Sequence, residues 1–177
     1  MHVRPARVAD AAAIFAVHAA AVEGERGRGD YDDREIDGWA WRHTPEQLAA
    51  RMRTRVFLVA ETGDDLVAYG QLDVAGGILR SAYVVPEWQR RGVGRRMAEA
   101  LLATARTNGV TTVTLDASLN AVGFYRSLGF DELDRADHPF ASGASLACVR
   151  MVKRLEPGGE PGSAGRAAPH ERERALP

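Results

Sequence analysis

The spacing of apolar residues predicts alternating strands and helices along most of the chain. In the stretch 92–108, Val93, Met97, Leu101 and Ala105 recur every four residues, which is typical of one buried helix face. Short apolar runs bounded by glycine or aspartate predict strands instead. We expect strands at about 2–7, 56–61, 66–74, 78–85, 112–116, 130–137 and 145–153, and helices at about 10–22, 34–42, 45–54, 92–108 and 119–128. This order predicts a mixed α/β domain.

The connections between these elements predict how the sheet is built. Short turns near 62–65 and 76–77 predict two consecutive antiparallel hairpins. The helix 92–108 joins the strands 78–85 and 112–116, and such a crossover is right-handed and makes its two strands parallel. The fold class predicted is a single mixed β-sheet flanked by helices.

The composition changes after residue 155. The last 22 residues contain four glycines, four prolines and no aromatic residue. Such a segment buries too little apolar surface to offset the entropy of ordering it. We predict one folded domain over 1–155 and a disordered Pro/Gly-rich tail over 156–177.

Charge and cysteine content argue against several kinds of partner. With a formal net charge of -1, the chain lacks the basic excess of nucleic-acid binders. Cys148 is the single cysteine, and no Cys/His spacing resembles a zinc site. The apolar segment 11–22 imitates a signal-peptide core, but it is mostly alanine, and no stretch reaches the ~18–20 apolar residues of a membrane span. We expect a cytoplasmic protein with no metal, nucleic-acid or membrane partner.

Arginine and glycine are concentrated between the strand 78–85 and the helix 92–108. The segment reads Gln89-Arg90-Arg91-Gly92-Val93-Gly94-Arg95-Arg96, with four arginines in seven residues. Backbone N–H groups at a helix N-terminus attract anions, and arginines clustered there oppose the helix dipole unless a phosphate neutralises them. We predict a phosphate-binding loop, with an ordinary helix start and incidental glycines as the alternative. The spacings of a Walker loop and of a dinucleotide fold are missing, so ATP is a further alternative without the expected magnesium residues.

Two segments resemble one protein family. Residues 84–94, VVPEWQRRGVG, resemble the coenzyme-binding motif of the GNAT superfamily of N-acetyltransferases, which is Gln/Arg-x-x-Gly-x-Gly/Ala after a strand ending in Val-x-Pro. Residues 115–130 resemble its Asn-x-x-Ala-x-x-Phe-Tyr-x-x-x-Gly-Phe segment, although here an alanine directly follows Asn120 and Val122-Gly123 precede Phe124-Tyr125. The motifs have the family's order and separation, and the resemblance extends over roughly residues 1–154.

This resemblance implies a centrally splayed sheet and transfer of acetyl from acetyl-CoA to a primary amine by direct attack in a ternary complex. Tyr125 would protonate the departing thiolate, whereas the residues alone predict a core tyrosine beside Phe124. The pantetheine arm would pair with the backbone near 83–85 like an added strand. The coenzyme-binding residues implied are Tyr83, Val84, Val85, Gln89, Arg90, Arg91, Gly92, Val93, Gly94, Arg95, Arg96, Asn120 and Tyr125.

The general base and the acceptor site are less defined. The strand 78–85 lacks the glutamate that many relatives carry, which leaves the base open among Glu23, Glu25, Asp37, Asp73, His43 and His138. Segment 23–37 has seven acidic residues against three arginines, so it could attract a cationic amine. We predict acceptor contacts from Tyr31, Trp39 and Trp41, with a solvated loop and two tryptophans anchoring a short helix as the alternative.

Several functional questions stay open at this stage. A small amine or amino-acid-like acceptor is favoured over a protein. The alternative from another class is a non-catalytic CoA-binding regulatory module, which Tyr125 argues against. We predict that Cys148 packs on the far terminal strand. The oligomeric state stays open, and an exposed edge strand could pair with a second copy to form a homodimer.

Overall fold

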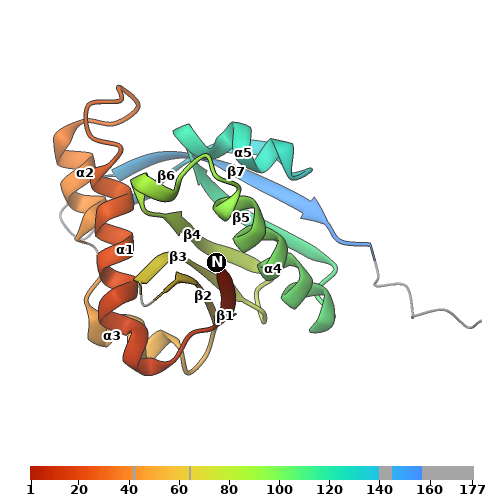
Figure 1. Ribbon diagram of the computed structural model, residues 1–177. Helices are drawn as coiled ribbons and strands as arrows, with labels where there is room; N and C mark the ends of the chain where they lie inside the picture. The colour runs from red at the N-terminus through yellow and green to blue at the C-terminus, as the bar shows by residue number, and fades with distance from the viewer. Residues whose placement is uncertain (42, 64, 140–144, 157–177) are drawn as a thin grey trace, which may run out of the picture.

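A seven-stranded sheet with the strand order β1-β2-β3-β4-β5-β7-β6 forms the centre of the computed structural model (Figure 1). The structure describes residues 1–41, 43–63, 65–139 and 145–156. The strands are β1 (His2–Pro5), β2 (Val56–Thr62), β3 (Asp65–Asp73), β4 (Ile78–Val84), β5 (Thr112–Ser118), β6 (Asp131–Pro139) and β7 (Ser145–Arg154). The α-helices are α1 (Ala11–Glu23), α2 (Asp33–Ala40), α3 (Pro45–Arg51), α4 (Val93–Thr107) and α5 (Val122–Ser127). Three 3-10 turns are η1 (Val8–Asp10), η2 (Pro86–Trp88) and η3 (Leu119–Ala121). These elements confirm the predicted mixed α/β class.

The sheet consists of two antiparallel parts that meet at one end. Strands β1 to β4 pair in sequence, and β7 pairs with both β5 and β6. Among the described residues, β4 and β5 share a single parallel register pair, Ile78 with Thr114, beside a hydrogen bond from Thr114 N–H to Gly77 O (2.9 Å). Beyond that point the two strands are not paired, which is the predicted central splay.

Helices α1 and α4 cover opposite faces of the first four strands (Figure 1). On α4, the predicted apolar face of Val93, Met97, Leu101 and Ala105 is buried. The helix packs so closely on β3 that a Cβ built on Gly70 would lie 2.5 Å from Leu101 Cδ1. On the other face, α1 packs Ile14 and Val17 into a second cluster with side chains of β2 and β3.

Three details differ from the sequence-based expectation. The first strand ends at Pro5, and the expected helix 119–128 is divided into η3 and α5. The last strand is not terminal in space, because β7 lies between β5 and β6. The side chains explain this order: β6 is rich in charge and exposed along almost its whole length, which suits a sheet edge, whereas β7 buries Leu146, Cys148, Val149 and Met151.

The predicted tail 156–177 lies, from residue 157 onward, outside the described residues. None of the helices within the described ranges combines the length and apolar character that crossing a membrane would require.

Candidate active site

Main-chain groups of β4 face the gap between β4 and β5. The N–H of Val85 donates to the Val67 carbonyl (3.0 Å), which sets the alternation of the β3–β4 ladder. Successive residues of a strand direct their main-chain N–H and C=O groups to opposite sides. Because the N–H of Val85 faces β3, the main-chain groups of Ala82 and Val84 point away from β3. The Gln89 side chain donates to the carbonyl of Val84 (3.2 Å). The main-chain groups available to a ligand in the gap are therefore those of Ala82 and the N–H of Val84, whereas the Val84 carbonyl and the Val85 N–H are already paired.

The N-terminus of α4 has no side-chain cap. Asp32 caps α2 and Thr44 caps α3, each in a reciprocal capping box. At α4 the N-cap is Gly92, with φ 79°, and among the described residues no side chain accepts from the first N–H groups. Arg90 also has a positive φ, 59°, which is uncommon for a residue with a side chain. The start of α4 thus has N–H groups without a hydrogen-bond partner among the described residues, at the positive end of a helix dipole, where an anion binds favourably.

The four arginines of this loop have different surroundings. Arg91 lies over the Trp88 ring, 5.2 Å from its centroid. Arg95 donates to Ser127 Oγ (3.1 Å) and lies 3.6 Å from a carboxylate oxygen of Glu99. Arg90 and Arg96 are exposed and have no ion pair within the described part of the chain. Both are available to a phosphorylated ligand.

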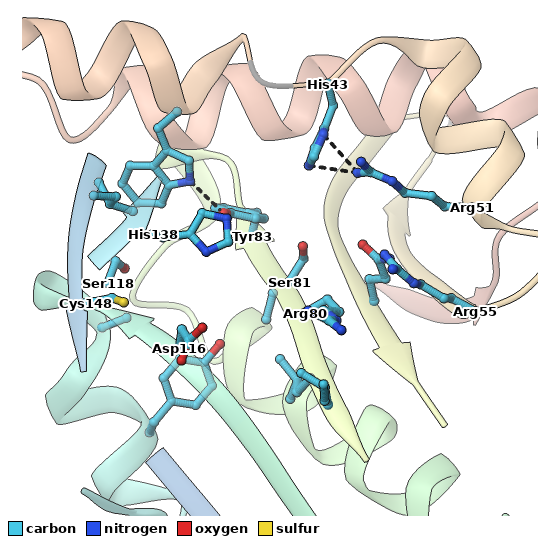
Figure 2. A pocket seen from close by; sticks show the side chains of 18 residues that line it. His43, Arg51, Arg55, Arg80, Ser81, Tyr83, Asp116, Ser118, His138 and Cys148 are labelled. Carbon is cyan, nitrogen blue, oxygen red and sulfur yellow. Dashed lines mark hydrogen bonds between the residues drawn. The ribbon is translucent and has the colours of Figure 1, made fainter. Parts of the chain in front are cut away.

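A cavity of about 280 Å³ lies at the gap (Figure 2). Its floor includes consecutive residues 78–83 of β4, and the opposite wall comes from β5, α5 and β7. Its polar and aromatic lining residues are Trp39, His43, Arg51, Arg55, Gln71, Arg80, Ser81, Tyr83, Asp116, Ser118, Tyr125 and His138. The cavity therefore brings residues of both sheet parts to one small volume.

Tyr125 lines this cavity from α5 and is buried, with 7% of its surface exposed. Its ring packs edge-on against Phe124 and Phe130, at centroid distances of 5.0 and 5.6 Å. Burial, with a smaller contribution from Tyr83, raises the pKa of the Tyr125 phenol well above its ordinary value. The phenol is therefore protonated at neutral pH, which is the form a general acid needs.

The three predicted acceptor residues have different positions. Trp39 is buried, lines the cavity and donates from Nε1 to Tyr83 Oη (2.8 Å). Tyr31 is buried outside the cavity lining, where its hydroxyl donates to Ala147 O (2.8 Å) and accepts from Leu119 N–H (2.7 Å). Trp41 is 61% exposed and packs against Phe15, 5.7 Å between ring centroids. Only Trp39 is in a position to contact a molecule in this cavity.

Among the candidate bases, His43 and His138 line the cavity. Arg26 forms ion pairs with Glu23, Asp33 and Asp37, so the charge of this acidic stretch is only partly compensated within the segment. Glu25 is buried beside Arg28 and the side chain of Asn120, and burial raises the pKa of its carboxyl. Asp73 forms ion pairs with Arg55 and Arg80 just behind the cavity wall.

Comparison with known proteins shows to which family this chain belongs. A model of the acetyltransferase (GNAT) domain matches residues 28–155, which is well over half of the chain. The chain belongs to the GNAT acetyltransferase family. The splayed sheet is therefore that of a GNAT fold, and it carries both the glycine–arginine loop (residues 89–96) and Tyr125 of α5.

Individual relatives agree with this assignment. A ribosomal-protein-alanine N-acetyltransferase of Salmonella typhimurium is 36% identical over 99 residues, 51% of this chain and 67% of the relative. The GCN5-related N-acetyltransferase of Rhodopseudomonas palustris has a TM-score of 0.80 at 29% identity, covering 87% of this chain and 95% of that one. A Salmonella typhimurium protein solved with acetyl-CoA has a TM-score of 0.62 at 25% identity, covering 92% and 98% of the two chains. This GNAT chain is an N-acetyltransferase.

The cavity also includes residues that the sequence did not single out. Gln71 and Ser81 are buried polar residues in apolar strands, a signal that could have identified them. Arg51, Arg55 and Arg80 gave no such signal, because arginines at the end of a short helix or on a strand usually face solvent.

Cys148 requires a correction. The expected position on a far terminal strand is wrong, since β7 is internal and Cys148 lines the cavity of this acetyltransferase. The thiol donates to Ala136 O (3.2 Å), and burial, followed by nearby carboxylates, raises its pKa to about 11. At neutral pH it is therefore a protonated thiol and a poor nucleophile.

Proposed function

We propose that this enzyme transfers acetyl from acetyl-CoA directly to a primary amine in a ternary complex, with Tyr125 as the general acid. The observation that carries the proposal is the gap between β4 and β5. Unpaired main-chain groups of β4 and the buried phenol of Tyr125 meet there in one cavity.

The glycine–arginine loop would bind the pyrophosphate end of the coenzyme. Its pyrophosphate would accept from the uncapped N–H groups at the start of α4, with Arg90 and Arg96 adding positive charge. The pantetheine amides would pair with the main chain of Ala82 and Val84 in place of the missing neighbour strand. Asn120, exposed on η3 near Glu25, would contact the coenzyme from the other side of the gap.

The chemistry follows from these positions. The neutral amine attacks the thioester carbonyl, a C–N bond forms, and a main-chain N–H of β4 stabilises the oxyanion. The C–S bond then breaks, and Tyr125 gives its proton to the coenzyme thiolate. From ordinary pKa values this proton transfer is uphill by only ~2 kcal/mol, to which the burial of Tyr125 adds. The amine loses its extra proton to a base, for which His43 and His138 are the candidates in the cavity.

The acceptor we favour is a small amine or an amino-acid-like metabolite. A volume of about 280 Å³ is at the lower end for ligand pockets and suits a small molecule beside the thioester. One relative, by its name, acetylates a ribosomal-protein alanine, so a peptide N-terminus is the competing acceptor.

Two-substrate kinetics test the proposal. Coenzyme thiol release is measured with a panel of amino acids, small amines and alanine-starting peptides, and both substrates are varied for the best acceptor. We expect intersecting double-reciprocal lines, as a ternary complex requires, and a Cys148→Ala variant that keeps its turnover. Parallel lines together with an inactive Cys148→Ala variant would instead indicate an acyl-cysteine intermediate. Tight coenzyme binding without release for any acceptor would favour the regulatory module.

A further inference from the structure

One end of the cavity is lined by three arginines from separate elements. Arg51 ends α3, Arg55 precedes β2, and Arg80 belongs to β4. Figure 2 shows Arg51, Arg55 and Arg80 on one side of the cavity, and Asp116, Ser118 and Cys148 on the other. The cavity is therefore polarised, with its positive end away from the β5 wall.

The positive charges of Arg55 and Arg80 are only partly compensated. Asp73 Oδ2 lies 3.4 Å from Arg80 Nη2 and 3.9 Å from Arg55 Nε, so one carboxylate is shared between two guanidinium groups. Arg51 Nη1 lies 2.9 Å from His43 Nδ1. Asp116 pairs with Arg150 on the opposite side of the cavity. An anion entering the cavity would restore the balance at the arginine end.

A buried amide at the same site lacks a partner. Gln71 on β3 is 3% exposed and lines the cavity, opposite Ser81 in the strand register. Its Nε2 group has no hydrogen-bond acceptor among the described residues. An unpaired buried donor lowers stability, which is explained if a ligand oxygen accepts from it.

We propose that the acceptor is an amino carboxylate, whose carboxylate binds Arg55, Arg80 and the Gln71 amide while its amine points toward Tyr125. A planar carboxylate matches the fork of a guanidinium group. This inference rests on the proposed acetyl transfer and names its substrate class. It excludes peptide N-termini as the main acceptors, because in a peptide the carboxylate beside the amine has become a neutral amide.

Matched acceptor pairs test the proposal. Each free L-amino acid of a panel is compared with its own carboxamide, which keeps the amine and side chain but removes the negative charge. We expect kcat/KM for thiol release to be about ten- to hundredfold higher for the acid, because charge-assisted hydrogen bonds are lost with the amide.

Variants identify the residues responsible. Arg80→Gln and Arg55→Gln should bring the acid-to-amide ratio of kcat/KM close to one by lowering the rate for acids, with the KM for acetyl-CoA unchanged. Gln71→Met should also lower the ratio, without a loss of thermal stability. Arg53→Gln is the matched control, because Arg53 is exposed and outside the cavity lining, and we expect it to keep the wild-type ratio.

Three results would overturn the inference: amides used as well as acids, alanine-starting peptides used better than any free amino acid, or no release with any acid although acetyl-CoA binds. Failure to bind acetyl-CoA would instead overturn the proposed function, so the two failures are distinguishable.

Discussion

Gly92 shows most clearly how a single position can serve a ligand. Its φ of 79° lies in the left-handed region, which favours glycine, and a Cβ built there would meet nothing within 4 Å. The protein itself therefore leaves space around this residue at the uncapped start of α4. A phosphate bound to the free N–H groups would occupy part of that space.

Substitutions of Gly92 by Asp and by Asn form a matched pair. Both side chains have the same shape and tolerate a left-handed backbone better than other residues, so they differ mainly in charge. We expect Gly92→Asp to raise the Kd of CoA at least about tenfold above that of Gly92→Asn, because a carboxylate repels the pyrophosphate. Calorimetry measures both values, and the gap should narrow at high salt. Equal Kd values for the two variants would show that the coenzyme pyrophosphate does not bind at this loop.

The proposed coenzyme residues follow from contiguous motifs, whereas the proposed acceptor residues are brought together only by tertiary contacts. The glycine loop and Tyr125 lie in contiguous segments whose pattern survives in one sequence. Arg51, Arg55 and Gln71 come from separate elements, and only folding brings them to one cavity. The same limit applies to Trp41, because a tryptophan two residues from a buried one can equally face solvent, as it does here.

At the scale of elements, the contact between β4 and β5 is the critical junction. Gly77 precedes β4 with φ 61°, and a Cβ there would lie 2.6 Å from the carbonyl oxygen of Thr112. This close approach accompanies the hydrogen bond between Gly77 and Thr114 that joins the two sheet parts. β4 and β5 therefore diverge from a tightly packed contact at Gly77, and the cavity lies where the two strands are apart.

Gly77→Ala should weaken this junction. Gly63 has the same φ of 61° with nothing near its Cβ position, so Gly63→Ala isolates the backbone cost, which is about 1 kcal/mol. We expect Gly77→Ala to lower the free energy of unfolding by a further ~1–3 kcal/mol, because its methyl group meets backbone. Denaturant titration of both variants measures the difference. Equal losses would mean that the junction can relax without cost.

Element order was predictable from the sequence, but the position of the last strand in the sheet was not. The hairpins and the crossover follow from short turns and from the length of α4, which are local features. Placing β7 inside and β6 at the edge depends on which strand better buries its side chains against β5. The charged sequence of β6 was the available signal for that arrangement.

At the scale of the whole molecule, the cavity exists because the two parts of the sheet are paired at one end of β4 and β5 and diverge beyond it. The part with β1 to β4 contributes the main chain of β4, Arg55 and Arg80, and the part with β5 to β7 contributes Asp116, with Tyr125 on the adjoining α5 and Trp39 on α2. Neither part forms the cavity alone (Figure 2). A thioester between the two parts would be reached by the acid from one side and by the acceptor from the other.

The measurement that tests this account most directly is turnover by Tyr125→Phe, alongside the Kd of CoA. Tyr69→Phe is the matched control, since Tyr69 is buried outside the cavity lining with its hydroxyl 3.3 Å from His18 Nδ1. We predict that Tyr125→Phe lowers kcat by about 100-fold or more with unchanged CoA affinity, and that Tyr69→Phe keeps its kcat. An unchanged kcat in Tyr125→Phe would contradict the account and make Tyr125 a packing residue.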